Sequence, residues 1–409
     1  MAKQPKIRFK GFTEEWKDAT LGQLVKEHRV SNQFVHHQNL LSLSYGKIVR
    51  RDIHANKGLL PASFDTYQII DKDTIVFRVT DLQNDKKSLR VAISEEEGII
   101  SPAYVCVDTI SDEIAASFLH QILHYHDVVT KIYYKMGDGM RQTLNFHDLQ
   151  ELKLKYPSND KEQRAIADIF NSVDTNIACK ERELEKLKNI KRALLDKLFP
   201  QNGQSFPAIR FKGFRGGWEN RRLKDIATRV TRKNIGLEST LPLCISAQLG
   251  LVSQTEYYNN VVVGANMENY FLIKRGEFAY NKSAAGEFPM GAVKCLKSLD
   301  KGILSTLYIV FALKDGVDAD YVQAHYETKP WQDDVKKRVA VGARNHGLLN
   351  ISPEDFFDSL VVIPENNDEQ KKIGQLLSKV SKTISLRERQ LTLLKHSKQA
   401  LLEQMFVNE

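Results

Sequence analysis

The sequence IRFKGF at residues 7–12, followed by Trp16, recurs as IRFKGF at residues 209–214, followed by Trp218. The two copies are offset by 202 residues. Self-similarity over a fixed long period indicates that one structural unit is written more than once in the chain. The 409 residues are also enough for two or three domains, each with its own core. The chain is therefore predicted to contain two copies of one unit.

Each copy also ends in the same way. Pro157 precedes Glu162-Gln163, and Pro364 precedes Glu369-Gln370, at an offset of 207 residues, whereas the stretches between the matched ends diverge. Each copy is therefore predicted to be a variable globular domain followed by a uniform helix. The predicted division is a first globular domain at 1–157, a first spacer helix at 158–200, a second globular domain at 201–364 and a second spacer helix at 365–409.

The globular parts mix strand and helix patterns. Short strands are predicted at 40–43, 74–79 and 104–107, and at 241–245, 278–280 and 308–313. Helices are predicted at 114–125 and 319–335, with loops after them marked by glycines at 137–139 and at Gly342. These patterns indicate an α+β domain with an irregular sheet.

Both spacer helices carry apolar residues spaced alternately three and four apart, which is typical of a coiled-coil seam. Every seam position of the first helix is apolar in the second as well. The predicted helix-pairing residues are Ile166, Phe170, Val173, Ile177, Leu184, Leu187, Leu194, Leu198, Ile373, Leu377, Val380, Ile384, Leu391, Leu394, Leu401 and Met405.

Polar residues interrupt both seams at the same place, at 180–182 and 387–389. If the helices pair antiparallel, these centres cross, and Glu181 or Glu388 could meet an arginine of the opposite helix. The favoured fold is thus α+β, with two pseudo-repeated globular domains separated by two long helices that form an antiparallel coiled coil. A parallel pair, a homodimer, and amphipathic helices packed on their own domains remain alternatives.

The charge favours an acidic partner such as nucleic acid. The net charge is +8, and the second copy is the more basic, with 21 Lys/Arg against 17 Asp/Glu at 209–364 and 21 against 20 at 1–157. The four cysteines have no C-x-x-C spacing, so buried thiols in a reducing cytoplasm are expected. The sequence has neither an apolar leader nor a run of 18 apolar residues, which predicts a cytoplasmic protein.

Motifs for chemistry are missing from the sequence. It contains no phosphate-binding or dinucleotide-binding glycine motif and no Asn/Asp-Pro-Pro loop of an adenine methyltransferase. A nuclease-like set of Asp138, Glu151 and Lys153 loses its lysine in the second copy, where Leu360 stands. His120 and His124 have helical i,i+4 spacing but no companion ligand. No catalytic residue, metal site or cofactor is therefore predicted on this chain.

The paired IRFKGF openings, the Pro-x-x-x-x-Glu-Gln helix beginnings and the Leu-Leu-x-x-Leu/Met-Phe helix ends at 194–199 and 401–406 resemble the specificity subunits of Type I restriction-modification systems. The resemblance spans essentially the whole chain. It implies two target-recognition domains, each reading one half of a bipartite double-stranded DNA sequence, on a subunit that is not itself catalytic.

The resemblance also implies partners. Two methyltransferase subunits would use S-adenosylmethionine to methylate adenine N6, and restriction subunits would use ATP and Mg for translocation and cleavage. No membrane partner is expected.

Candidate DNA contacts are basic, amide and aromatic residues that share predicted loops. They are Lys47, Arg50, Arg51, Arg78, Lys86, Lys87, Tyr133, Tyr134, Lys135, Arg141 and Gln142 in the first copy, and Arg229, Arg232, Lys233, Asn234, Gln248, Asn281, Lys282, Arg344, Asn345 and His346 in the second.

Three other functions remain alternatives: a coiled-coil structural or adaptor protein, the specificity half of a related bipartite-site restriction-methylation enzyme, and a self-sufficient nuclease or methyltransferase. Steep salt dependence of binding to duplex DNA would favour a DNA-reading subunit over an adaptor.

Overall fold

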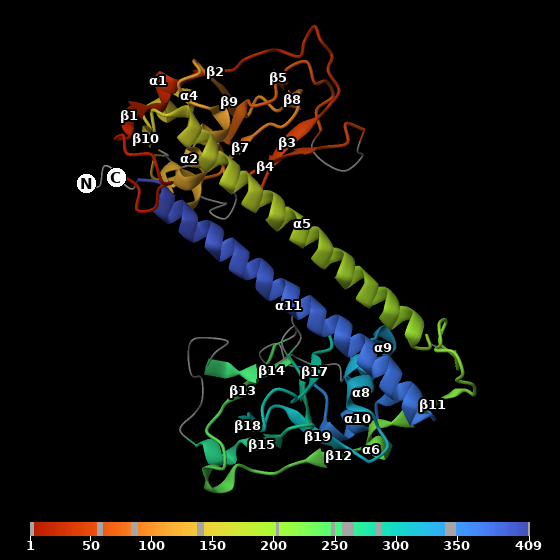
Figure 1. The fold of residues 1–409 in the computed structure, drawn as a ribbon. Coiled ribbons are helices and arrows are strands. Elements are labelled where there is room, and N and C mark those ends of the chain that lie inside the picture. The colour runs from red at the N-terminus through yellow and green to blue at the C-terminus, as the bar shows by residue number, and fades with distance from the viewer. Residues whose placement is uncertain are drawn as a thin grey trace. The chain divides into compact units, whose positions relative to one another are not determined.

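The computed structural model describes residues 4–54, 60–82, 89–136, 143–201, 204–246, 250–255, 266–283, 288–339 and 349–407. The chain divides into two compact units. The first unit contains residues 1–179 and 391–409, and the second contains residues 180–390. Figure 1 shows the elements of both units.

The first unit is built from antiparallel strands and short helices. Its central sheet has the order β2 (Val25–Glu27), β9 (Tyr104–Thr109), β6 (Ile75–Arg78) and β7 (Val91–Ile93). Three two-stranded pairs accompany it: β1 (Lys17–Thr20) with β10 (Lys153–Tyr156), β3 (Leu41–Ser44) with β4 (Lys47–Arg50), and β5 (Gln68–Ile70) with β8 (Gly98–Ile100). The helices are α1 (Leu21–Leu24), α2 (Ala116–Tyr125), α3 (Ile132–Met136) and α4 (Phe146–Gln150), with a π-helical turn at His126–Thr130 after α2.

The central sheet is buried on both faces. Side chains alternate along a strand, so Ile75 and Phe77 of β6 enter the core that contains Phe118 of α2. Val76, between them, packs with Leu41 of the β3–β4 hairpin in a second core. This double burial explains why the strands read as continuous apolar runs in the sequence.

The second unit repeats this topology strand for strand. Its central sheet is β12 (Ala227–Val230), β19 (Ile309–Leu313), β16 (Phe278–Asn281) and β17 (Ala292–Cys295). The pairs are β11 (Trp218–Arg222) with β20 (Leu360–Pro364), β13 (Leu243–Ser246) with β14 (Gly250–Ser253), and β15 (Phe271–Lys274) with β18 (Lys301–Leu304). Its helices are α6 (Leu223–Ile226), α8 (Ala319–His325), α9 (Lys329–Arg338) and α10 (Pro353–Phe357). The predicted α+β class and the duplication are confirmed.

The single helix predicted at 319–335 is wrong. The structure has two helices there, α8 and α9, because Thr328 takes an extended conformation as the N-cap of α9 and Pro330 lies in the first turn. Proline has no N–H to continue a preceding helix, but it is well tolerated at a helix start. The predicted loops at 137–139 and Gly342 lie outside the described residues.

The two long helices are α5 (Asp160–Leu198) and α11 (Asn367–Met405). In the first unit the rings of Phe170 and Phe406 lie 5.7 Å apart, and Lys398 of α11 binds Asp174 of α5 at 2.8 Å. In the second unit, α5 and α11 again run in opposite directions, with Lys188 bound to Glu388 at 2.8 Å. The predicted antiparallel pairing is confirmed in each unit.

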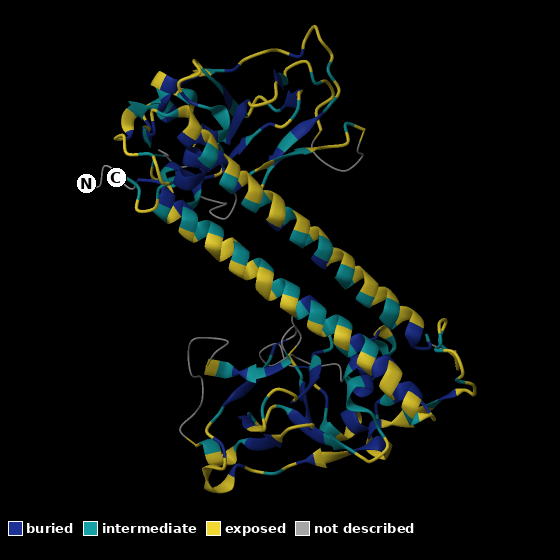
Figure 2. Ribbon diagram, viewed as in Figure 1, coloured by how far each residue is buried: buried dark blue, intermediate teal, exposed yellow. Residues whose placement is uncertain are grey.

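The predicted seam is the packed stripe of both helices. None of the sixteen predicted pairing residues is exposed, and nine of them are buried. Figure 2 shows the exposed stripe on the other side of each helix. Glu388 of the polar centre contacts a lysine of the opposite helix, Lys188, which the prediction did not include.

The repeated motifs tie each globular part to its helix. Arg8 of the first opening donates two hydrogen bonds, 2.6 and 2.8 Å long, to the fully buried carboxylate of Glu162 at the start of α5. Arg210 does the same with Glu369, at 2.7 Å for both bonds. The neighbouring Gln163 donates to the carbonyls of Pro157 and Glu113. These contacts give the motifs a structural role.

The helix ends complete the globular cores. Phe406, at the end of α11, packs on Trp16 in the first unit with ring centroids 6.5 Å apart. Phe199, just after α5, packs on Trp218 in the second unit at 6.0 Å. Each core therefore includes the helix end contributed by the other repeat.

Among the described residues, no helix combines the length and the apolar character needed to cross a membrane.

Candidate nucleic-acid interface

Three chain segments of the first unit come together beside β6 and β7. The turn of the β3–β4 hairpin lies against Leu89, because a Cβ added at Gly46 would stand 2.8 Å from that side chain. The backbone N–H of Leu144, after α3, donates to the carbonyl of Val79, after β6, at 2.9 Å. The three segments are the β3–β4 hairpin, the two ends of the β6–β7 connection, and the chain just before α4. We call the surface that they form the recognition edge of the first unit.

Arg90 fixes part of this edge from inside the protein. It is 1% exposed, and its guanidinium donates to the carbonyls of Thr80 at 2.6 Å and Asp81 at 3.1 Å. These bonds hold the chain that leaves β6 against the strand that returns as β7. No pattern in the sequence distinguishes Arg90 from a surface arginine, so sequence reasoning missed it.

The second unit has the same edge in the same place. The N–H of Leu349, before α10, donates to the carbonyl of Lys282, after β16, at 2.9 Å. This bond matches the one between Leu144 and Val79. Gly291, before β17, has a φ of +75°, and an added Cβ would lie 2.2 Å from the carbonyl of Asn281, so the two chain segments touch there. The recognition edge of the second unit therefore consists of the ends of β16 and β17 and the segment before α10.

Several predicted contacts of the first copy lie on or beside its recognition edge. Lys47, Arg50 and Arg51 are exposed along and after β4. Arg50 donates hydrogen bonds of 2.8 and 2.9 Å to Glu96, and this carboxylate raises its pKa. Arg78 ends β6, with Asp81 at 3.5 Å. DNA phosphates would compete with these two carboxylates for the arginines.

Tyr133 is not a surface residue, which corrects the prediction. It is 1% exposed, and its hydroxyl donates to the carbonyl of Leu123 at 3.0 Å. Burial raises the pKa of this hydroxyl. Its ring packs edge-on against Phe77 in the core. Of its neighbours on α3, Tyr134 is half-buried, with the guanidinium of Arg90 over its ring, and Lys135 is exposed.

Asn234 is a second correction. It is fully buried, and its side chain donates to the carbonyls of Ser239 and Met267. A buried amide with satisfied hydrogen bonds holds its own loop and cannot read a base. The residue type suits both roles, so the sequence pattern could not separate them.

Three predicted contacts of the second unit lie away from its recognition edge: Arg229, Arg232 and Lys233. β12 and β17 are the two opposite edges of the central sheet, and Arg229 is on β12. Arg232 binds Glu277 at 3.0 Å, and Lys233 donates to the carbonyl of Asn269. Of the predicted contacts in this unit, the structure thus brings Asn281 and Lys282 to the recognition edge.

The remaining candidates lie outside the described residues: Lys86, Lys87, Arg141, Gln142, Gln248, Arg344, Asn345 and His346. A residue that the prediction missed is Tyr45, which is 74% exposed at the turn of the β3–β4 hairpin. A Tyr-Gly pair between two strand patterns was the signal for it.

The described residues hold no group of three His, Cys, Asp or Glu side chains that could bind a metal ion. His120 and His124 stack on α2 with ring centroids 6.1 Å apart. His124 is buried and its Nε2 lies 3.2 Å from Nζ of Lys398 on α11, whereas His120 is half-buried. Burial lowers the pKa of His120 to about 4 and also lowers that of His124.

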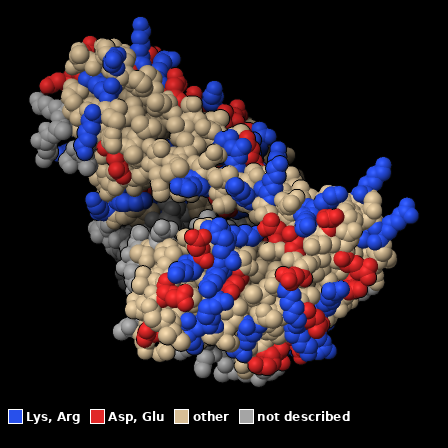
Figure 3. Space-filling model, turned by 60° about the horizontal axis from the view of Figure 1, so that its bottom comes forward, with Lys and Arg blue, Asp and Glu red and all other residues tan. Residues whose placement is uncertain are grey.

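Lysine and arginine side chains are interspersed with aspartate and glutamate over the face drawn in Figure 3. This face therefore presents no broad field of one sign.

Residues 13–189 match the family model of the Type I restriction modification DNA specificity domain. A comparison with curated protein sequences found no match.

Among solved structures, the S subunit of a Type I restriction-modification system from M. genitalium has a similar fold. It is 13% identical, with a TM-score of 0.67 over 99% of this chain and 100% of that one. The HsdS subunit from Thermoanaerobacter tengcongensis is 14% identical, with a TM-score of 0.39 over 96% of each chain.

The first repeat thus carries a DNA-specificity domain, and the second repeat has the same topology.

Proposed function

We propose that this chain is a DNA-specificity subunit that reads a bipartite DNA target, one half-site with each recognition edge. The observation that carries the proposal is the equivalence of the two edges, each fixed by a matching backbone hydrogen bond, Leu144 to Val79 and Leu349 to Lys282. The scaffold is the same in both units, whereas the side chains on it differ. Two edges of this kind suit two different short sequences.

The chemistry of reading would come from side chains at these edges. Lysine and arginine bind phosphates and, in the major groove, guanine, while asparagine pairs with adenine. The exposed Lys47 and Arg51 of the first unit and the half-buried Lys282 of the second would make such contacts. We also propose that Arg141-Gln142 and Arg344–His346 contribute, because Leu144 and Leu349, which follow them in the chain, lie at the recognition edges.

We propose further that the subunit positions two methyltransferase subunits and restriction subunits on the DNA. S-adenosylmethionine, ATP and Mg would belong to those partners, which would carry out adenine-N6 methylation and ATP-dependent cleavage. The absence of catalytic motifs from the sequence and the match of residues 13–189 to a DNA specificity domain support this division of labour.

The test is to co-express the chain with the methyltransferase genes that neighbour it and to map methylated adenines in the host genome. We expect one bipartite motif with a spacer of constant length. Lys47→Ala should weaken binding to all sequences alike and lower the salt dependence by about one phosphate contact. If binding to DNA does not depend on salt and the methylated adenines show no bipartite motif, a structural adaptor would be favoured instead.

A further inference from the structure

The recognition edge of the first unit contains a residue with a strained backbone. Asp81, shortly after β6, has a φ of +59°. Non-glycine residues seldom occupy this left-handed region, and they persist in it where surrounding contacts enforce it. The carboxylate of Asp81 lies 3.5 Å from the guanidinium of Arg78, which is one of the predicted DNA contacts. The conformation at Asp81 therefore affects how Arg78 is presented.

Arg90 supplies the contacts that enforce this conformation. Its guanidinium donates to the carbonyls of Thr80 at 2.6 Å and of Asp81 at 3.1 Å. Its own carbonyl accepts a hydrogen bond of 2.8 Å from the N–H of Arg78. The guanidinium also lies over the ring of Tyr134, 5.5 Å from the ring centroid. One residue just before β7 thus binds the end of β6 and the chain that leaves it.

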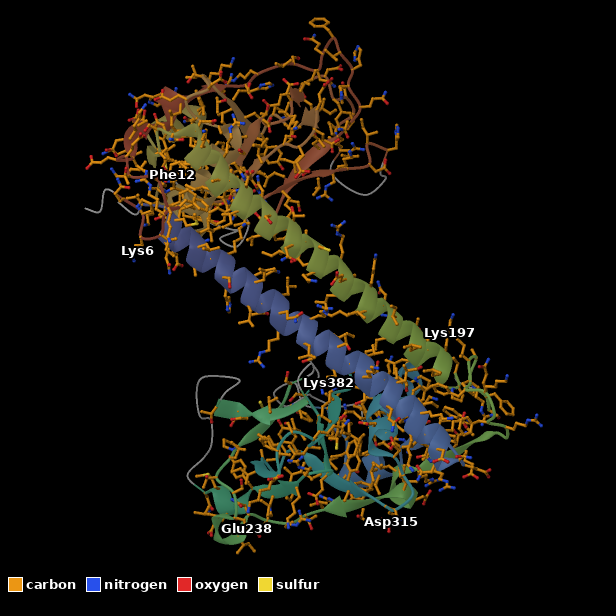
Figure 4. The ribbon with its side chains drawn as sticks, in the orientation of Figure 1. Lys6, Phe12, Lys197, Glu238, Asp315 and Lys382 are labelled. Carbon is orange, nitrogen blue, oxygen red and sulfur yellow. The ribbon has the colours of Figure 1, made fainter. Side chains whose placement is uncertain are left out.

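Asp127 holds Arg90 from inside the protein. It belongs to the π-helical turn after α2, and its carboxylate accepts a hydrogen bond from the backbone N–H of Arg90. Asp127 is 0% exposed and Arg90 1%. Both lie in the interior of the first unit's globular part, whose side chains Figure 4 shows. Asp127 is therefore the inner end of a series of hydrogen bonds that reaches the recognition edge through Arg90.

The second unit does not have this arrangement. By the register of the strands, Arg90 stands opposite Arg78, the last residue of β6, and Ala292 stands opposite Asn281, the last residue of β16. Alanine has no guanidinium with which to hold the chain after β16. There the backbone packs directly instead, since a Cβ added at Gly291 would lie 2.2 Å from the carbonyl of Asn281. The second unit is therefore an internal comparison for the first.

The surroundings of Asp127 make its charge sensitive to pH. Burial raises the pKa of this carboxyl to about 6, although the N–H of Arg90 and the charge of Lys131 lower it. His126, on the same turn, stays neutral near pH 6, because burial lowers its pKa to about 4. The hydroxyl of Tyr133, on α3, is also neutral, because burial raises its pKa. Of these groups, Asp127 is the one that changes its charge near pH 6.

We propose that Asp127 is a positioning residue for the first recognition edge: through Arg90 it holds the chain at Thr80 and Asp81 in the conformation that reads DNA. This inference rests on the proposed function. Protonation of the carboxylate weakens its hydrogen bond to Arg90 and removes a negative charge beside a buried guanidinium. The strained chain at Asp81 then loses support. Reading of the first half-site therefore weakens as the pH falls through about 6, whereas reading of the second does not.

The test measures how strongly each half-site is read at about pH 7.5 and about pH 5.5, on either side of the transition of Asp127. The chain, in complex with its methyltransferase subunits, is titrated with the target duplex and with duplexes in which one half-site is scrambled. The affinity lost on scrambling a half-site measures how strongly it is read. A hybrid that carries residues 1–157 identifies the half-site of the first unit. For that half-site the loss should be about tenfold smaller at the lower pH, and for the other it should be unchanged.

Two variants test the residues themselves. Asp127→Asn keeps the shape of the side chain and removes its charge, so at about pH 7.5 it should read the first half-site as weakly as the unchanged chain does at about pH 5.5. Its pH dependence should disappear. Arg90→Met keeps the apolar stem without the guanidinium and should have the same effect. Reading of the second half-site should be normal in both variants.

Asp108→Asn is the matched control. Asp108 accepts a hydrogen bond of 2.9 Å from Thr74, which precedes β6 at the end of that strand opposite the recognition edge. This variant should keep the pH response of the unchanged chain.

Equal weakening of both half-sites at the lower pH would refute the role of Asp127 and leave the proposed function standing. Normal reading of the first half-site by Asp127→Asn and Arg90→Met would do the same. If Asp127→Asn does not fold, the pH profile of the unchanged chain and the Arg90→Met variant still decide. If the unchanged chain reads neither half-site at about pH 7.5, the proposed function fails and this inference fails with it.

Discussion

The Nζ atom of Lys191, on α5, lies 2.6 Å from a carboxylate oxygen of Glu327, which follows α8 in the second unit. Lys294 of β17 binds the other oxygen at 2.7 Å. In the first unit Lys398, which matches Lys191 at the offset of 207 residues, lies 3.2 Å from Nε2 of His124 and binds Asp174. In each unit, a lysine near the end of the other repeat's long helix contacts the globular part. The two lysines occupy equivalent sequence positions, but their partners differ.

Glu327→Gln should destabilise the second unit by about 3 kcal/mol or more, because it leaves two lysines near a buried site without their counter-charge. Although burial alone would raise the pKa of Glu327, Lys294 and Lys191 lower it to about 2, so the carboxylate is charged at neutral pH. Urea unfolding measures the change. Lys188→Ala is the control, because the 40% exposed Lys188 side chain in its pair with Glu388 should contribute about 1 kcal/mol or less. Equal losses for the two variants would contradict the prediction.

The first unit should be the more sensitive to acid. Burial lowers the pKa of His120 and His126 to about 4, and burial with the charge of Lys398 lowers that of His124. In the second unit the pKa of His325 is likewise lowered to about 4. These histidines stay neutral in the folded protein, whereas an unfolded chain protonates them below about pH 6.5. Stability is therefore full above that pH and decreases as the pH falls toward 4.

Hydrogen exchange followed by mass spectrometry at pH 7 and pH 5, corrected for the intrinsic exchange rate, would test this difference between the units. Peptides of the first-unit core should lose more protection than those of the second. His120→Leu should reduce the loss in the first unit alone. A larger loss in the second unit would show that the histidines do not control acid stability.

Phe406→Ala should destabilise the first unit, although residue 406 is far in sequence from most of that unit's core residues. The ring is 4% exposed and contacts Trp16, Phe118, Tyr125 and Phe170. Removing a buried phenylalanine typically costs about 3–5 kcal/mol. Hydrogen exchange of first-unit peptides would detect the local unfolding, with Phe199→Ala as the mirror variant that affects the second unit. Leu393→Ala, at a 57% exposed position of α11, should have little effect.

Recognition should be modular. A hybrid that carries residues 1–157 of this chain and the second half of a relative should methylate this chain's first half-site joined to the relative's second. The reason is that each recognition edge is formed within one unit. Mapping of methylated adenines reads the outcome, and methylation of the relative's entire site would contradict it.

We expect the helices to set the spacer between half-sites. Inserting four residues after Glu181 and four after Glu388 adds about 6 Å to each helix while nearly keeping its packed face. At about 3.4 Å per base pair, the preferred spacer should lengthen by one or two base pairs with both half-sites unchanged. Two-residue insertions rotate the seam by about 200° and should abolish assembly. An unchanged spacer in the four-residue variant would show that another element sets it.

Sequence reasoning succeeded where the signal was local or periodic. The duplication and the seam of α5 and α11 follow from the offset of matched residues and from apolar spacing, and the structure confirms them. The same reasoning failed where tertiary packing decides. Tyr133 and Asn234 have the polar character of DNA contacts but turn inward, and only the packed domain shows this. The placement of Arg229 on the far edge of the sheet likewise depends on strand order, which no short pattern encodes.

The chain's division into one continuous and one discontinuous unit has a consequence for its synthesis. Residues 180–390 form the second unit without interruption, whereas the first unit needs residues 391–409 as well. On the ribosome the first unit is therefore begun first and completed last. Until α11 emerges, Trp16 and Phe118 lack the cover of Phe406, so the nascent first unit exposes an aromatic surface that chaperones can bind.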